Sequence, residues 1–108
     1  GNTVVLKPAE QAAASILTIA ELFDAAGFPK GVVNVVCGTG EVAGDALVRH
    51  PDVRKIAFTG STATARRITE RSAPGLKPLA FELGGKSPNI VFADADLERA
   101  TVGASTAA

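Results

Sequence analysis

Ile56-Ala57-Phe58-Thr59-Gly60-Ser61-Thr62 joins an apolar run to a glycine turn, and two hydroxyl residues follow the glycine. The apolar character of residues 53–58 predicts a β-strand. Ser61 is a favourable N-cap for a helix that we expect to reach about Arg71. Residues 76–83 form another apolar run and predict the next strand. A strand, a helix and a strand in this order predict a βαβ unit with parallel strands.

The same alternation of strand and helix patterns extends along the whole chain. We expect further strands at residues 4–6, 32–36 and 89–92, and further helices at residues 11–26, 41–49 and after Asp94 or Asp96. The predicted fold class is therefore α/β, with a Rossmann-like, open, mostly parallel sheet and flanking helices. Several of the strands are apolar without alternation, which predicts that both faces of the sheet are covered.

Composition limits the classes of function. The chain has 108 residues, of which 46% are hydrophobic, so we expect a packed core. Eleven basic residues balance eleven acidic ones, which argues against nucleic acid and anionic membranes as partners. A single cysteine excludes an internal disulfide and a Cys-based zinc site, and we predict no metal site. No membrane-spanning run or signal peptide is present, and we predict a cytoplasmic protein. The chain contains no Met, and we interpret it as an internal segment of a longer protein.

Glu82 is the most informative carboxylate, because it closes an apolar run and is followed after Leu83 by Gly84 and Gly85. A carboxylate in such a place is expected to be poorly solvated, which suits a general base. The two glycines would allow a ligand or another backbone to approach closely. The alternative is an ordinary turn at the end of a strand. In open α/β sheets ligands bind at the carboxyl ends of strands, and Glu82 lies at such an end.

Two glycine turns compete as a phosphate site. Residues 38–43 read Gly-Thr-Gly-Glu-Val-Ala and match the dinucleotide pattern literally. However, Glu41 would place negative charge near a pyrophosphate, and the next strand ends without the acid that the pattern expects. Gly60 and Ser61 form the better anion site, because a close backbone and a hydroxyl lie at a helix N-terminus. The alternative for Ser61 is a simple N-cap.

Four segments together resemble the NAD(P)-dependent aldehyde dehydrogenase superfamily, in that family's order and spacing. The resemblance covers essentially the whole chain, and four motifs in register are far more specific than one glycine pattern. It implies that residues 1–85 belong to an NAD-binding domain and that residues 86–108 begin the catalytic domain. The four segments are VVLKPAE at residues 4–10, GFPKGVVNVV at 27–36, IAFTGST at 56–62 and FELGGKSP at 81–88.

The resemblance implies a cofactor site made of five residues. Lys7 and Glu10 would hold the hydroxyls of the adenosine ribose, and Gly40 would lie near the adenosine half of the cofactor. Ser61, next to Gly60, would contact the pyrophosphate. An acceptor carboxylate at Glu10 favours free ribose hydroxyls and would repel a 2′-phosphate, so we expect NAD, with NADP as the alternative.

Glu82 matches the family's catalytic glutamate. In that chemistry a cysteine thiolate attacks an aldehyde, hydride passes to the nicotinamide, and the glutamate activates the water that hydrolyses the thioester to a carboxylic acid. The alternatives are a CoA-acylating semialdehyde dehydrogenase and a non-catalytic nucleotide-binding member of the fold. The resemblance places the nucleophile beyond Ala108, so residues 1–108 alone are expected to be inactive. It also implies a homo-oligomer for the full-length protein. One departure is Ala65, where the family commonly has glycine.

Other reactive side chains have structural interpretations. We interpret Cys37 as a small core residue at the end of a buried strand, and not as the nucleophile. His50 precedes a proline at a predicted helix end, where a structural role is favoured. Arg66, Arg67 and Arg71 share one predicted helix and are expected to form its solvated face.

Overall fold

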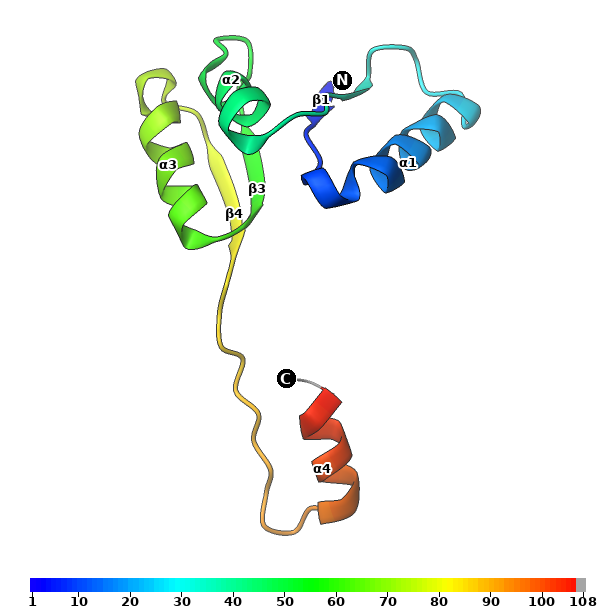
Figure 1. Cartoon of the computed structure of the whole chain (residues 1–108), viewed down its shortest axis with the longest axis vertical. Helices are drawn as coiled ribbons and strands as arrows, with labels where there is room; N and C mark the ends of the chain where they lie inside the picture. The colour runs from blue at the N-terminus through cyan, green and yellow to red at the C-terminus, as the bar shows by residue number, and fades with distance from the viewer. Residues whose placement is uncertain (107–108) are drawn as a thin grey trace.

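The computed structural model describes residues 1–106 and begins with a βαβ unit (Figure 1). Its strands β1 and β2 pair in parallel, with Val4 opposite Val33 and Leu6 opposite Val35. Helix α1 ends where Gly27 adopts the left-handed conformation (φ 80°) that glycine accepts readily. The unit consists of β1 (Val4–Leu6), the 3-10 helix η1 (Glu10–Ala12), α1 (Ala13–Ala25) and β2 (Val33–Val35).

A second βαβ unit follows and contains the segment that predicted the fold. Strands β3 and β4 pair in parallel from Ile56–Leu79 to Gly60–Leu83. The expected α/β class with parallel strands is thus confirmed, although residues 1–106 form two two-stranded sheets and not one continuous sheet. The π-helical turn η2 (Gly40–Gly44) and α2 (Asp45–Arg49) connect the first unit to the second. The second unit consists of β3 (Ile56–Gly60), α3 (Thr62–Ser72), the 3-10 helix η3 (Ala73–Gly75) and β4 (Leu79–Leu83).

Helix α3 begins and packs as its sequence predicts. The Ser61 hydroxyl accepts a hydrogen bond from the Thr64 amide at 3.2 Å, which confirms the N-cap. Ala65, Ile68 and Ser72 recur on one helical face and are buried. The three arginines of the helix are exposed, as expected of a solvated face.

Strand β4 starts three residues later than predicted, at Leu79. Leu76 lies in the left-handed region (φ 48°), and Pro78 has no amide hydrogen to donate to a ladder. The Pro78 carbonyl still accepts a hydrogen bond from the Ile56 amide at 3.1 Å, and pairing begins from there. Strand β3 also differs from its predicted bounds of residues 53–58. It starts at Ile56 and continues to Gly60, so both of its ends lie further along the chain.

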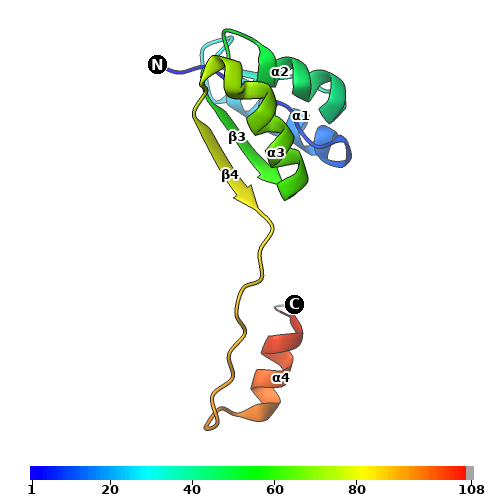
Figure 2. The same ribbon diagram turned by 90° about the vertical axis from the view of Figure 1, so that its left-hand side faces the viewer.

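The fifth predicted strand, at residues 89–92, is wrong. After Leu83 the chain runs in extended form away from both sheets and reaches α4 (Leu97–Thr106), as Figures 1 and 2 show. An isolated extended segment has no neighbouring strand to share its backbone hydrogen bonds, so no ladder forms. Helix α4 is capped by Asp96, whose Oδ1 accepts from the amides of Glu98 (3.0 Å) and Arg99 (3.2 Å), which confirms one of the two predicted caps.

The packed core expected from composition is not formed by these residues. Buried hydrophobic side chains are limited, within residues 1–106, to Val48, Ala65 and Ile68. The three residues of β1 are exposed, and β3 and β4 alternate between half-buried and exposed positions. The expectation that both faces of the strands are covered is therefore wrong for this chain. Its helices cover one face of β3 and β4 and leave the other open.

Helix lengths bear on the membrane question. None of the helices within residues 1–106 is both long enough and apolar enough to cross a bilayer.

The small core leads to a prediction about the 108-residue polypeptide on its own. The Cα radius of gyration is 19.1 Å, against about 13 Å for a compact domain of this length. We expect calorimetry of the isolated polypeptide to show no cooperative unfolding peak. A sharp transition with an enthalpy near the roughly 70 kcal/mol typical of 108-residue domains would contradict this expectation.

Candidate functional site

Three of the residues predicted to bind the cofactor meet at the first βαβ unit. The Lys7 ammonium lies 3.9 Å from Oε1 of Glu10, and the same carboxylate oxygen accepts a hydrogen bond from the Gly40 amide at 3.1 Å. Lys7 also donates to the carbonyl oxygens of Pro8 (2.6 Å) and Gly38 (3.1 Å). Strand β1, the start of η1 and the turn after β2 thus converge on one polar cluster.

The electrostatics of this cluster keep Glu10 ionised. Its own backbone amide, the Lys7 ammonium and the Gly40 amide together lower the pKa of Glu10 below its usual 4.5. The Glu10 side chain is 53% exposed, whereas that of Lys7 is only 18% exposed. An exposed, ionised carboxylate beside a mostly covered ammonium can accept hydrogen bonds from ligand hydroxyls and repels ligand anions.

The turn at Gly38 has a structural explanation for its glycine pattern. A Cβ at Gly38 would lie 2.8 Å from the Cβ of Ala43, so this close approach requires glycine at the first position and a small residue at the last. The Thr39 hydroxyl accepts from the Val42 amide at 3.3 Å and begins the helical turn. The Gly40 amide is already bonded to the Glu10 carboxylate, which disfavours an anion here and adds a second reason to the negative charge of Glu41.

The other predicted residues meet at the second βαβ unit. Gly60 is paired with Leu83, so Ser61 and Glu82 lie at the same carboxyl edge of the β3–β4 pair. A Cβ at Gly60 would lie 2.5 Å from Cζ of Phe58, which explains the need for glycine at this turn. Lys7, Glu10 and Gly40 therefore form one group, and Gly60, Ser61 and Glu82 form another.

Glu82 is exposed, which corrects the expectation of a poorly solvated carboxylate. Strand β4 alternates, and its half-buried positions are Leu79 and Phe81. The Glu82 side chain therefore points to the face that no described element covers. A Cβ at Gly84 or Gly85 would meet no atom within 4 Å, so the close approach expected at these glycines is not seen within residues 1–106.

Cys37 is also exposed, so its interpretation as a core residue is wrong. Strand β2 ends at Val35, and Cys37 lies beyond it in the turn to Gly38. His50 has the structural role that was predicted. Its Nδ1 accepts from the Asp52 amide at 3.2 Å, and its carbonyl accepts from the Lys77 ammonium at 2.6 Å.

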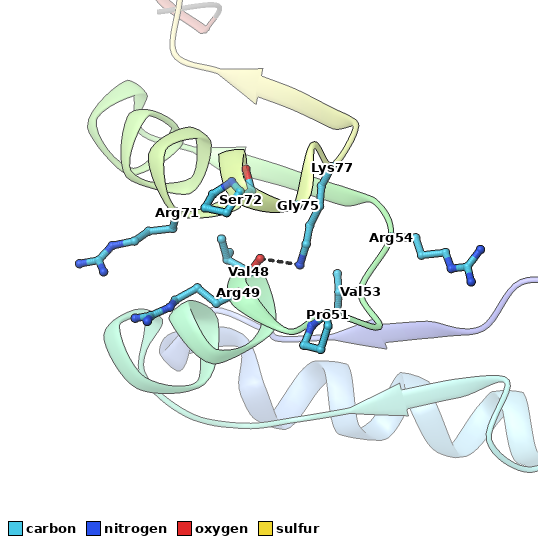
Figure 3. Close-up of a pocket in the computed structure, with 10 residues that line it drawn as sticks. Val48, Arg49, Pro51, Val53, Arg54, Arg71, Ser72, Gly75 and Lys77 are labelled. Atoms are coloured by element: carbon cyan, nitrogen blue, oxygen red, sulfur yellow. Dashed lines mark hydrogen bonds between the residues drawn. The ribbon is translucent and has the colours of Figure 1, made fainter.

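A cavity of about 570 Å³ lies at the amino ends of β3 and β4 (Figure 3). Glu82 lies toward the opposite, carboxyl end of the strand pair. Lys77 crosses the cavity and donates to the Val48 carbonyl at 2.7 Å, which ties the end of α2 to the start of β4. Arg49 and Arg71 both pair with Asp45, at 3.2 and 3.7 Å. None of the predicted site residues therefore lines this cavity.

Thr59 lies at the same carboxyl edge of the strand pair as Gly60 and Glu82. Thr59 is the register partner of Glu82, so the two Cα positions face each other across the strand pair. The pairing of Thr59 with Glu82 follows once the two parallel strands end at Gly60 and Leu83, because each residue is one position before the end of its strand.

Comparison with known proteins decides the family. The model of the aldehyde dehydrogenase family matches residues 1–108. The chain belongs to the aldehyde dehydrogenase family. The chain spans about one fifth of the length of the curated aldehyde dehydrogenases that it matches. Ala65 stands where the family commonly has glycine. It belongs to the buried face of α3 and is 3% exposed, so its methyl group is accommodated in the core.

Individual aldehyde dehydrogenases match almost the whole chain. The 2-aminomuconic semialdehyde dehydrogenase of Danio rerio is 64% identical over 99 residues, which cover 92% of this chain and 20% of the relative. The phenylacetaldehyde dehydrogenase of Pseudomonas fluorescens is 57% identical over 107 residues, which cover 99% and 21%. The crystal structure of PnpE in complex with nicotinamide adenine dinucleotide superposes with a TM-score of 0.91 at 60% identity, covering 96% and 21%.

The contact between Glu10 and Gly40 predicts a pH dependence with a definite sign. Because the pKa of Glu10 is lowered in the folded chain, its contribution to stability is complete above 4.5 and is lost as the pH falls through the lowered value. We expect the amide resonance of Gly40 in isotope-labelled protein to titrate with a midpoint below 4.5, and Glu10→Gln to abolish this titration. A midpoint at or above 4.5 would contradict the contact.

Proposed function

We propose that this chain is the cofactor-binding part of an NAD-dependent aldehyde dehydrogenase that oxidises an aldehyde to a carboxylic acid. The observation that carries the proposal is the position of Glu82, an exposed carboxylate at the same strand edge as Gly60 and Ser61. A site for an anion and a group able to take a proton from water are thereby adjacent. The nucleophilic cysteine is proposed to lie outside these residues.

The described residues fit a dinucleotide. Glu10 and Lys7 would hold the ribose hydroxyls next to Gly40, since an ionised acceptor and a donor lie 3.9 Å apart there. Ser61 at the N-terminus of α3, with Gly60 before it, would hold the pyrophosphate. The bound nicotinamide would supply the hydride acceptor. The negative charge of Glu10 favours NAD over NADP, because a 2′-phosphate would meet a carboxylate.

Glu82 would act after oxidation, as the base for hydrolysis. Its carboxylate would accept a proton from water while the water oxygen bonds to the acyl carbon and the thiolate leaves. This role favours a free acid as product over an acyl-CoA. Exposure of the carboxylate toward the open sheet face gives water access to it.

The domain division is proposed on the same basis. Residues 1–85 are assigned to the NAD-binding domain and residues 86–108 to the start of the catalytic domain, with residues 107–108 outside the described part. Support comes from the chain path, because β4 ends at Leu83 and the following segment leaves both sheets. Homo-oligomer formation, an aldehyde as substrate of the full-length protein and a cytoplasmic location stay predictions.

Glu82→Gln tests the catalytic role in the full-length protein. Because the amide cannot accept a proton from water, we expect steady-state oxidation of a simple aldehyde to fall by about 10²- to 10⁴-fold. The first turnover of NADH should be retained, since the glutamate acts after it. Glu21→Gln, an equivalent change on the exposed surface of α1, serves as the control and should leave the rate unchanged. Unimpaired turnover in Glu82→Gln would refute the assigned role.

Glu10→Gln tests the proposed preference for NAD. Removing the negative charge removes the repulsion of a 2′-phosphate, so the ratio of NAD to NADP efficiency should fall by about tenfold. Steady-state kinetics with each cofactor at fixed aldehyde concentration would measure the ratio. An unchanged ratio would show that Glu10 does not contact the adenosine ribose.

A further inference from the structure

The Glu10 carboxylate is held by a backbone donor from a distant part of the chain. Its Oε1 accepts a hydrogen bond from the Gly40 amide at 3.1 Å, and the two residues are 30 positions apart. The Lys7 ammonium lies 3.9 Å from the same oxygen. Because both contacts use Oε1, the second oxygen, Oε2, can accept a hydrogen bond from a ligand.

The Gly40 amide can make this contact because the helical turn does not use it. Gly40 is the first residue of η2, and the amides of a first helical turn have no acceptor within the helix. The Thr39 hydroxyl accepts from the Val42 amide, and the Thr39 carbonyl accepts from that of Ala43. Neither bond involves the Gly40 amide, which donates to Glu10 instead.

Packing within residues 1–106 leaves the Glu10 side chain 53% exposed. A glutamate side chain has several rotatable bonds, and fixing them on binding costs free energy. A hydrogen bond to a charged acceptor is stronger than one between neutral groups, so the amide can supply the restraint that packing does not. An anchored carboxylate also keeps its negative charge in place when a ligand anion approaches.

We propose that Gly40 is a positioning residue, whose amide anchors Oε1 of Glu10 so that Oε2 accepts from the adenosine 2′-hydroxyl of NAD and a 2′-phosphate is excluded. The inference rests on the proposed ribose site at Glu10. Discrimination between NAD and NADP then depends on the direction in which the carboxylate is held as well as on its charge. Gly40 acts on the cofactor through its backbone and through a second residue.

Gly40→Pro removes the amide hydrogen and fits the local backbone. Proline is tolerated at the first position of a helix, and Thr39 before it is extended (φ −67°, ψ 154°), as the residue before a proline prefers to be. Gly40→Ala keeps the amide hydrogen, and its Cβ would meet no atom within 4 Å, so it is the matched comparison. In the full-length protein, calorimetric titration should give a Kd for NAD about 3- to 10-fold higher for Gly40→Pro than for Gly40→Ala, with a smaller change for NADP.

Glu10→Ala separates positioning from a direct effect on the cofactor. In this background the two Gly40 variants should bind NAD equally. A persisting difference, or an equal loss of affinity for NADP in the original comparison, would overturn the inference. If Glu10→Ala binds NAD as tightly as the unsubstituted protein, the proposed ribose site fails. If Glu10→Ala weakens NAD binding while the two Gly40 variants match each other, only the inference about Gly40 fails.

A measurement on the unsubstituted full-length protein decides the case in which Gly40→Pro does not fold. The contact has to persist in the complex, so hydrogen exchange of the Gly40 amide should be no faster with bound NAD than without it. Faster exchange in the complex would show that Glu10 leaves the amide on binding, which is incompatible with positioning.

Discussion

The parallel pairing of β3 with β4 is the interaction on which the candidate site depends. A shift of one residue in this register would move Glu82 from the open face to the face covered by α3. The rings of Phe58 and Phe81 resist such a shift, because they pack against each other and under the helix. Bulky apolar packing on one face therefore holds the polar chemistry of the other face in place.

Features set by neighbouring residues in the sequence were predictable. The order of strands and helices, the hydroxyl cap at Ser61 and the carboxylate cap at Asp96 all follow from interactions within a few residues. The placement of Glu82 beside Gly60 follows as well, because a βαβ unit brings the carboxyl ends of its strands together. Family motifs then supplied roles that spacing alone does not give.

Features set by distant neighbours were not predictable in the same way. An apolar strand becomes buried only if other elements cover it, and within residues 1–106 a single helical layer covers β3 and β4. This explains why Glu82 is exposed where burial was expected. Cys37 is exposed because β2 ends at Val35, before it. The predicted strand at residues 89–92 needs a strand partner as well, and none is supplied by the described chain. The contact between Glu10 and Gly40 spans 30 positions and likewise depends on tertiary structure.

The extended segment after Leu83 has a mechanical consequence for the proposed base. Glu82 lies one residue from the point where the backbone leaves the sheet, and a single covalent strand connects it to α4 (Figure 2). Gly84 and Gly85 follow Leu83, and a Cβ at either would meet no atom within 4 Å. A chain that is free to bend at two successive glycines does not transmit a pull, so the region that holds α4 can change its orientation without dragging the carboxylate from its place in the sheet.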